Sequence, residues 1–167
     1  MKQLLVNYTN YNHWANDRIC NTLKMSDLSI LDTEIKSSFK SIRKTLYHIW
    51  DAETIWYRRL NGSSPTDWAS EKFSGSFDDF IWQFLTNSRL FNTYVNSKSY
   101  AELMAIIDYT NTAGKKFRNV IANIIIHCIN HSTFHRGQIY TAMRMNGVTI
   151  LPSIDYITYI RENINEQ

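Results

Sequence analysis

Two histidines, His131 and His135, lie four residues apart in the sequence. On an α-helix such residues are separated by only about 6 Å and point the same way, so both imidazoles can reach one ion at bonds of about 2 Å. Both also fall on the stripe expected to face the core. That stripe includes Ile121, Ile124, Cys128, Ala142 and Met145. Because a buried imidazole without a partner costs a few kcal/mol, the pattern favours a bound metal ion.

Two ligands rarely hold a metal ion, and the chain has three further histidines, His13, His48 and His127. His127 lies one turn before His131 and about 12 Å along the axis from His135, which is too far for all three rings to share an ion. We interpret it as a structural or supporting residue. His48 lies in the middle of another predicted helix, and facing helices commonly build metal sites in bundles. His13 is a weaker competitor, because it lies beside the core stripe of its helix. The predicted ligands are therefore His48, His131 and His135.

The chemistry of three neutral imidazoles restricts the metal and the reaction. Without a carboxylate or thiolate, such a set suits zinc, nickel, cobalt or iron(II), and it lacks the carboxylate of the facial triad in iron oxygenases. Three protein ligands leave room for a water or substrate, whose pKa the metal would lower. Zinc proteases place Glu directly after the first histidine of the helix pair, whereas this chain has Ser132. The pattern therefore disfavours a peptidase.

The helical period of apolar residues predicts four long helices and one short one. The long helices are expected at about 3–24, 39–61, 76–95 and 119–146, and the short C-terminal helix at about 152–164. Ser and Asp three residues apart at the start of the third helix form a capping-box pattern, and Asn-Gly pairs end the second and fourth. These elements predict an all-α fold, an antiparallel four-helix bundle with a short fifth helix.

Two segments depart from the helical period. Residues 63–75 contain proline, glycine and four serines, which predicts a loop and the best candidate for a mobile or lid-like segment. Residues 100–117 are typical of extended chain around a turn. We therefore expect a small irregular or extended insertion before the fourth long helix.

Composition restricts the domain organisation, location and partners. The length of 167 residues suits a single domain over 1–167. A net charge of +3 without a run of five basic residues indicates no nucleic-acid partner. Cys20 and Cys128 are too few for a disulfide framework, which fits a reducing cytoplasm. No stretch approaches the length of a membrane span and residues 1–14 are not typical of a secretion signal, so we expect a cytoplasmic protein without a membrane partner.

Three parts of the sequence together resemble the DinB family, and the resemblance spans nearly the whole chain. The matching residues are Asn130, His131, His135-Arg136-Gly137-Gln138, Met143, Arg144 and Gly147 near the C-terminus, Leu46-Tyr47-His48-Ile49, Glu53 and Trp56 in the second helix, and Tyr11, Trp14, Ala15 and Asn16 in the first. The resemblance implies a four-helix bundle with a divalent metal ion held by three histidines, here His48, His131 and His135. It also implies a homodimer, an assembly that members of the family often form.

The resemblance leaves several reactions open. Proteins similar to DinB include thiol S-transferases that use bacillithiol-like or mycothiol-like cofactors. The leading hypothesis is therefore a transferase whose divalent ion, zinc or nickel, binds a low-molecular-weight thiol for attack on an electrophilic small molecule. One alternative is a metal-dependent hydrolase of a small ester or amide. The other is a non-catalytic, stress-associated protein in which the metal only braces the bundle.

Several residues near the histidines could support them. Asp51 and Glu53 are candidates to accept a proton from a ligand imidazole, with contact to solvent or an arginine as the more frequent role of a helix carboxylate. We expect Arg136 and Gln138 to make a salt bridge or cap within the bundle, with contact to a substrate anion as the alternative. Cys128 is interpreted as inert core filling, with a thiolate ligand or redox partner as the alternative.

Overall fold

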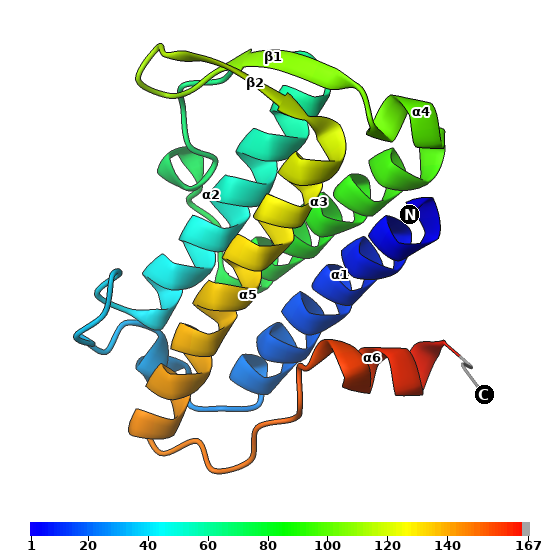
Figure 1. Cartoon of the computed structure of the whole chain (residues 1–167). Coiled ribbons are helices and arrows are strands. Elements are labelled where there is room, and N and C mark those ends of the chain that lie inside the picture. The colour runs from blue at the N-terminus through cyan, green and yellow to red at the C-terminus, as the bar shows by residue number, and fades with distance from the viewer. Residues whose placement is uncertain (165–167) are drawn as a thin grey trace.

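The computed structural model describes residues 1–164 and places four long helices side by side (Figure 1). The long helices are α1 (Lys2–Lys24), α2 (Ile42–Leu60), α3 (Phe77–Ser97) and α5 (Ile121–Met145). The shorter elements are the 3-10 helices η1 (Leu28–Leu31) and η2 (Ser70–Lys72), the helices α4 (Tyr100–Leu103) and α6 (Tyr156–Asn163), and the strands β1 (Ile106–Thr110) and β2 (Lys116–Val120). This architecture confirms the predicted all-α four-helix bundle.

The relative directions of the helices differ from the predicted antiparallel arrangement. Near the end of α3, the Tyr94 hydroxyl donates to the carbonyl of Leu60, which ends α2. Near the start of both helices, the rings of Tyr47 and Phe80 lie 5.0 Å apart. α2 and α3 are therefore parallel, and the connection over residues 61–76 returns along the bundle. A connection of that length allows either direction, so the sequence pattern could not decide it.

Apolar side chains fill the bundle in two clusters, one toward each end. Between them lies a buried polar layer centred on Glu53 and Arg136, which are 1% and 0% exposed. Glu53 accepts side-chain hydrogen bonds from the three other long helices, the donors being Asn12, Asn16, Ser88 and Ser132. Arg136 donates to Oδ1 of Asn12 and Asn16 at 2.6 and 2.9 Å. Because all four helices take part, the layer fixes the register of α2 against α5.

Element boundaries shift from the predictions for local reasons. α2 begins at Ile42, later than predicted, because Ser41 is its N-cap and accepts a hydrogen bond from the Lys44 amide. α5 begins at Ile121 because the preceding residues, 116–120, pair with β1 as strand β2. Met145, predicted on the core stripe, is 73% exposed because it is the last residue of α5.

The predicted extended insertion is an antiparallel hairpin, and the short helix α4 before it was not predicted. In the hairpin, Ile106 pairs with Val120 and Thr110 with Lys116. The hairpin lies over the end of the α2–α5 pair (Figure 1), where the Tyr109 ring is 5.2 Å from that of Trp56. It therefore closes the space between α2 and α5 at one end.

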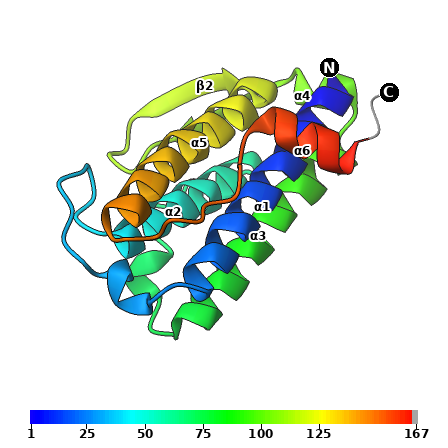
Figure 2. The same cartoon turned by 90° about the horizontal axis from the view of Figure 1, so that it is seen from below.

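The C-terminal helix α6 packs against α1 (Figure 2). It begins at Tyr156, later than the predicted start near 152, and Asp155 is its N-cap. No helix within residues 1–164 is long and apolar enough to cross a membrane.

The loop over residues 63–75 is anchored on α2. The backbone amide and the hydroxyl of Ser70 both donate to the carboxylate of Asp51. The segment that contacts the predicted metal ligands is a different one, the linker before α2, through Phe39. The loop over residues 63–75 is thus not the segment that packs on the predicted ligands. Its lid-like behaviour stays a prediction.

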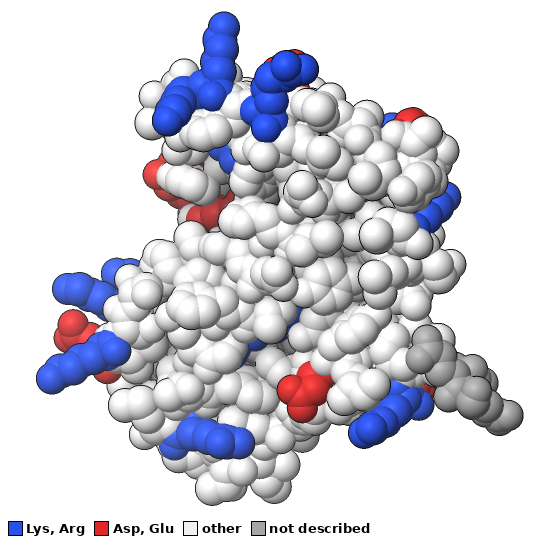
Figure 3. Space-filling view, in the orientation of Figure 1, with Lys and Arg blue, Asp and Glu red and all other residues white. Residues whose placement is uncertain are grey.

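The face that carries α5 is largely uncharged. Most of its Lys and Arg side chains lie near the margins of the view (Figure 3). On this face of the described chain, we find no continuous basic surface of the kind that follows a nucleic-acid backbone.

Candidate metal centre

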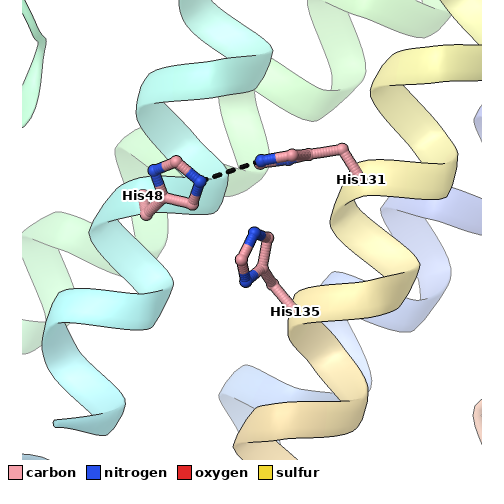
Figure 4. Close-up of side chains that lie close together, drawn as sticks. All are labelled: His48, His131 and His135. Carbon is pink, nitrogen blue, oxygen red and sulfur yellow. Dashed lines mark hydrogen bonds between the residues drawn. The ribbon is translucent and has the colours of Figure 1, made fainter. Parts of the chain in front are cut away.

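His48 on α2 and His131 and His135 on α5 point toward one another across the space between the two helices (Figure 4). The Nε2 atoms of His48 and His131 are 2.8 Å apart. One ring nitrogen from each of the three histidines lies within 4.8 Å of the others. The structure therefore brings together the three residues that the sequence singled out.

Partial burial keeps the three imidazoles neutral. His135 is 5% exposed, and His48 and His131 are half-buried. Desolvation, with a smaller contribution from His135, lowers the pKa of His48 and that of His131 to about 4. Desolvation also lowers the pKa of His135. Neutral imidazole is the form that binds a metal, so the ring lone pairs are available at neutral pH.

Gln138 orients one of the three rings. Its Oε1 lies 2.7 Å from Nδ1 of His135, an arrangement in which Nδ1 donates and Nε2 keeps its lone pair. The expectation that Asp51 or Glu53 does this was wrong, because Asp51 binds Ser70 and Glu53 belongs to the polar layer. The spacing of three residues between His135 and Gln138, one helical turn, could have indicated the contact.

An aromatic side chain that the sequence analysis missed packs on the cluster. The Phe39 ring stacks on His48 with a centroid distance of 4.2 Å and meets the edge of His135 at 5.6 Å. It removes water from one side of the imidazoles, which contributes to their desolvation. Phe39 was predicted as the first residue of the second helix but lies in the linker before α2, so the helical period could not place it at the cluster.

The other two histidines and Cys128 lie outside the cluster of three. The His127 ring is 6.2 Å from that of His131 and packs against Trp56 at 5.4 Å. Nδ1 of His13, on α1, is buried and has no hydrogen-bond partner within residues 1–164. Cys128 is 1% exposed, and burial raises the pKa of its thiol well above the ordinary value. This supports the interpretation of Cys128 as inert core filling.

The three nitrogens fit the requirements of a divalent ion. Tetrahedral bonds of about 2.0–2.1 Å place ligand nitrogens roughly 3.3 Å apart, which small side-chain rotations reach from the separations seen here. Nδ1 of His131 is buried without a hydrogen-bond partner in the described chain. Nε2 of His131 faces Nε2 of His48, so Nε2 is the atom available to an ion.

Comparisons with known proteins identify the family of the chain. The sequence model of the DinB family matches residues 1–167. The chain belongs to the DinB family. Protein DinB of Bacillus subtilis (strain 168) is 26% identical over 157 residues, which cover 90% of each chain.

A solved structure shares the fold of this DinB-family chain. It is that of YfiT from Bacillus subtilis, described as a probable metal-dependent hydrolase with an unusual four-helix bundle topology. The TM-score is 0.70 at 12% sequence identity, over 88% of this chain and 90% of that one. At this identity the similarity shows the fold alone.

We expect the metal-free protein to lose stability as the pH falls from about 6.5 toward 4. Histidines in the unfolded chain protonate near pH 6.5, whereas folded His48 and His131 keep a pKa of about 4. The unfolded state therefore binds more protons in this range, and its relative free energy falls. Above about pH 6.5 these rings are neutral in both states and add no dependence.

Thermal unfolding at pH 7 and pH 5 measures this effect. A variant with His48→Gln and His131→Gln should show a smaller drop in melting temperature between the two pH values than the wild type. An equal drop would show that these imidazoles are not the cause.

Proposed function

We propose that His48, His131 and His135 bind one divalent metal ion, zinc or nickel, and that the centre catalyses transfer of a small thiol to an electrophilic molecule. When bound, the ion supplies Lewis-acid chemistry, which lowers the pKa of a thiol so that its thiolate is available at neutral pH. The observation that carries this proposal is the convergence of three neutral ring nitrogens. Three protein ligands leave coordination positions for a small molecule.

The surroundings of the histidines favour a thiol nucleophile. In the described part of the chain, the cluster contains histidines only, with no carboxylate to act as a base. A thiol has an ordinary pKa near 8.5 and is far more acidic than water, so it needs less assistance to ionise. In the reaction, the sulfur forms a bond to the electrophilic carbon, the leaving group departs with its electron pair, and the thiol proton passes to solvent.

The thiol must come from solution. The two cysteines of the chain, Cys20 and Cys128, are buried, and burial raises the pKa of both thiols. Neither is therefore a nucleophile at neutral pH. The role of the protein is to hold the ion through neutral rings, to orient His135 through Gln138, and to exclude water on one side through Phe39.

Hydrolysis is the second candidate reaction. It is favoured by the fold similarity to YfiT, which is described as a probable metal-dependent hydrolase. The same three histidines would serve, with water in place of the thiol. Such a reaction would release product from a small ester or amide without any added thiol.

A chromogenic assay separates these reactions. The metal-loaded protein is incubated with 1-chloro-2,4-dinitrobenzene and bacillithiol, with glutathione and cysteine in parallel. We expect turnover that His135→Ala abolishes and that the control Arg144→Gln, at the exposed end of α5, retains. No turnover with any thiol would reject the transferase. Metal-dependent release from a nitrophenyl ester without thiol would favour the hydrolase instead.

A further inference from the structure

Two neighbouring depressions lie along α5, one that includes His131 and one that reaches the hairpin. Of the side chains that line them, Trp56 comes from α2, and Asn123, His127 and His131 come from α5. A shallow depression that includes His131 shares Asn123 and His127 with a separate pocket of about 270 Å³. The histidine cluster and this pocket are therefore neighbours along one continuous surface.

The pocket is aromatic, with polar groups in its lining. Its lining residues are Trp56, Tyr109, Asn119, Asn123, Ile124 and His127. The Trp56 ring stands at a steep angle to both Tyr109 and His127, with centroid distances of 5.2 and 5.4 Å. Asn123 lies two turns from His131, or about 12 Å along α5. A small molecule seated here can thus extend to the candidate metal centre.

Arg59 packs against two residues that line this pocket, Trp56 and Tyr109, and is buried without an acidic partner. It is 7% exposed, and its guanidinium lies over the rings of Trp56 and Tyr109, at 4.7 and 5.3 Å from their centroids. Among residues 1–164, its Nε has no hydrogen-bond partner, and no carboxylate opposes the lowering of its pKa by burial. Its neighbour Arg58, by contrast, is exposed and lies 3.6 Å from a carboxylate oxygen of Asp67.

Arg136, the other buried arginine of the described chain, has a structural role and provides a comparison. Its Nε, like that of Arg59, has no partner in the described chain, but its Nη1 and Nη2 donate to Asn12, Asn16 and Thr133. Arg59 has rings against its face, its Nε has no partner among the described residues, and no carboxylate lies within ion-pair distance of it there. Leaving a charged donor unpaired is costly, and an incoming oxyanion would offset that cost with charge-assisted hydrogen bonds.

We propose that Arg59 and the pocket form an oxyanion subsite, which holds the carboxylate or phosphate of a small molecule whose reactive group reaches the three histidines. Trp56 and Tyr109 position the guanidinium and pack against the apolar part of the ligand. The subsite defines the substrate class as an elongated molecule with its anionic group roughly 12–16 Å from its reactive atom. Only the orientation of the ligand, with its reactive group at the three histidines, rests on the proposed function. The contact between the anion and Arg59 requires no metal.

Binding of small aromatic anions tests the subsite. Benzoate and phenyl phosphate are titrated against the metal-free and zinc-loaded protein, and the tryptophan indole resonances are followed by nuclear magnetic resonance. We expect saturable shifts of the Trp56 indole. Arg59→Met should weaken binding at least tenfold, while the matched control Arg58→Met leaves it unchanged. The neutral isostere benzamide should bind at least tenfold more weakly than benzoate, a comparison that requires no variant.

The outcomes distinguish this inference from the proposed function. Equal binding of benzamide and benzoate, or unchanged affinity in a folded Arg59→Met variant, would overturn the subsite. Anion binding to a protein that takes up no zinc would support the subsite and reject the metal centre. Zinc binding without anion binding would reject the subsite alone. The stronger of the two anions identifies the group as carboxylate or phosphate.

Discussion

Replacing Arg136 with methionine is expected to lower the free energy of unfolding by about 3–5 kcal/mol. Methionine retains an apolar stem but removes the cation, and the buried carboxylate of Glu53 loses the charge that Asn12 and Asn16 link to it. Removing one charged member of such a network lowers the free energy of unfolding by more than the intact network contributes, because the remaining charge stays buried without its partner. Urea unfolding followed by circular dichroism measures the change.

The double variant Arg136→Met with Glu53→Gln provides the matched control. A neutral amide costs less to bury than an unpaired carboxylate, so the double variant should be more stable than Arg136→Met alone. If the losses in free energy of unfolding of the two single variants simply add in the double variant, the interpretation that the two charges stabilise one another through the asparagines is contradicted.

His131→Ala is expected to weaken zinc binding by at least about a hundredfold. Removing a residue that only orients a ligand imidazole costs about 10–100-fold, and loss of the ligand itself should equal or exceed the upper value. Gln138→Ala, which frees the His135 ring, should fall within that range. Calorimetry with a competing chelator measures both affinities.

His127→Gln is the control for this series, since it lies one turn from His131 on the same helix. Its ring packs against Trp56, outside the cluster of three. The variant should bind zinc as the wild type does. An equal loss in His127→Gln and His131→Ala would assign the ion to a different pair of rings.

The sequence predicted the long helices well because their apolar residues follow a strong period. The capping box at Ser76 and Asp79 marked the start of α3, and the structure contains both of its hydrogen bonds. The direction of α3 was not predictable, because it depends on the path of the 61–76 connection. The single-domain organisation, the homodimer and the cytoplasmic location stay predictions.

The histidine cluster was predictable because the position of each histidine on its own helix indicates a ligand. His131 and His135 share a face by spacing, and His48 lies on a second helix of the bundle. The supporting residues were harder to predict, because they depend on register between elements. Phe39 reaches the cluster from an irregular linker, and Arg59 meets Tyr109 only because the hairpin folds over α2. Tertiary packing sets both contacts.

X-ray absorption spectroscopy at the zinc edge, on protein loaded with one equivalent of the metal, tests the central claim most directly. The account predicts three imidazole nitrogens at about 2.0–2.1 Å and a further light ligand that an added thiol replaces with sulfur. The three-imidazole signature should disappear in His48→Ala. A shell with fewer than three imidazoles, or one containing protein sulfur before any thiol is added, would contradict the account.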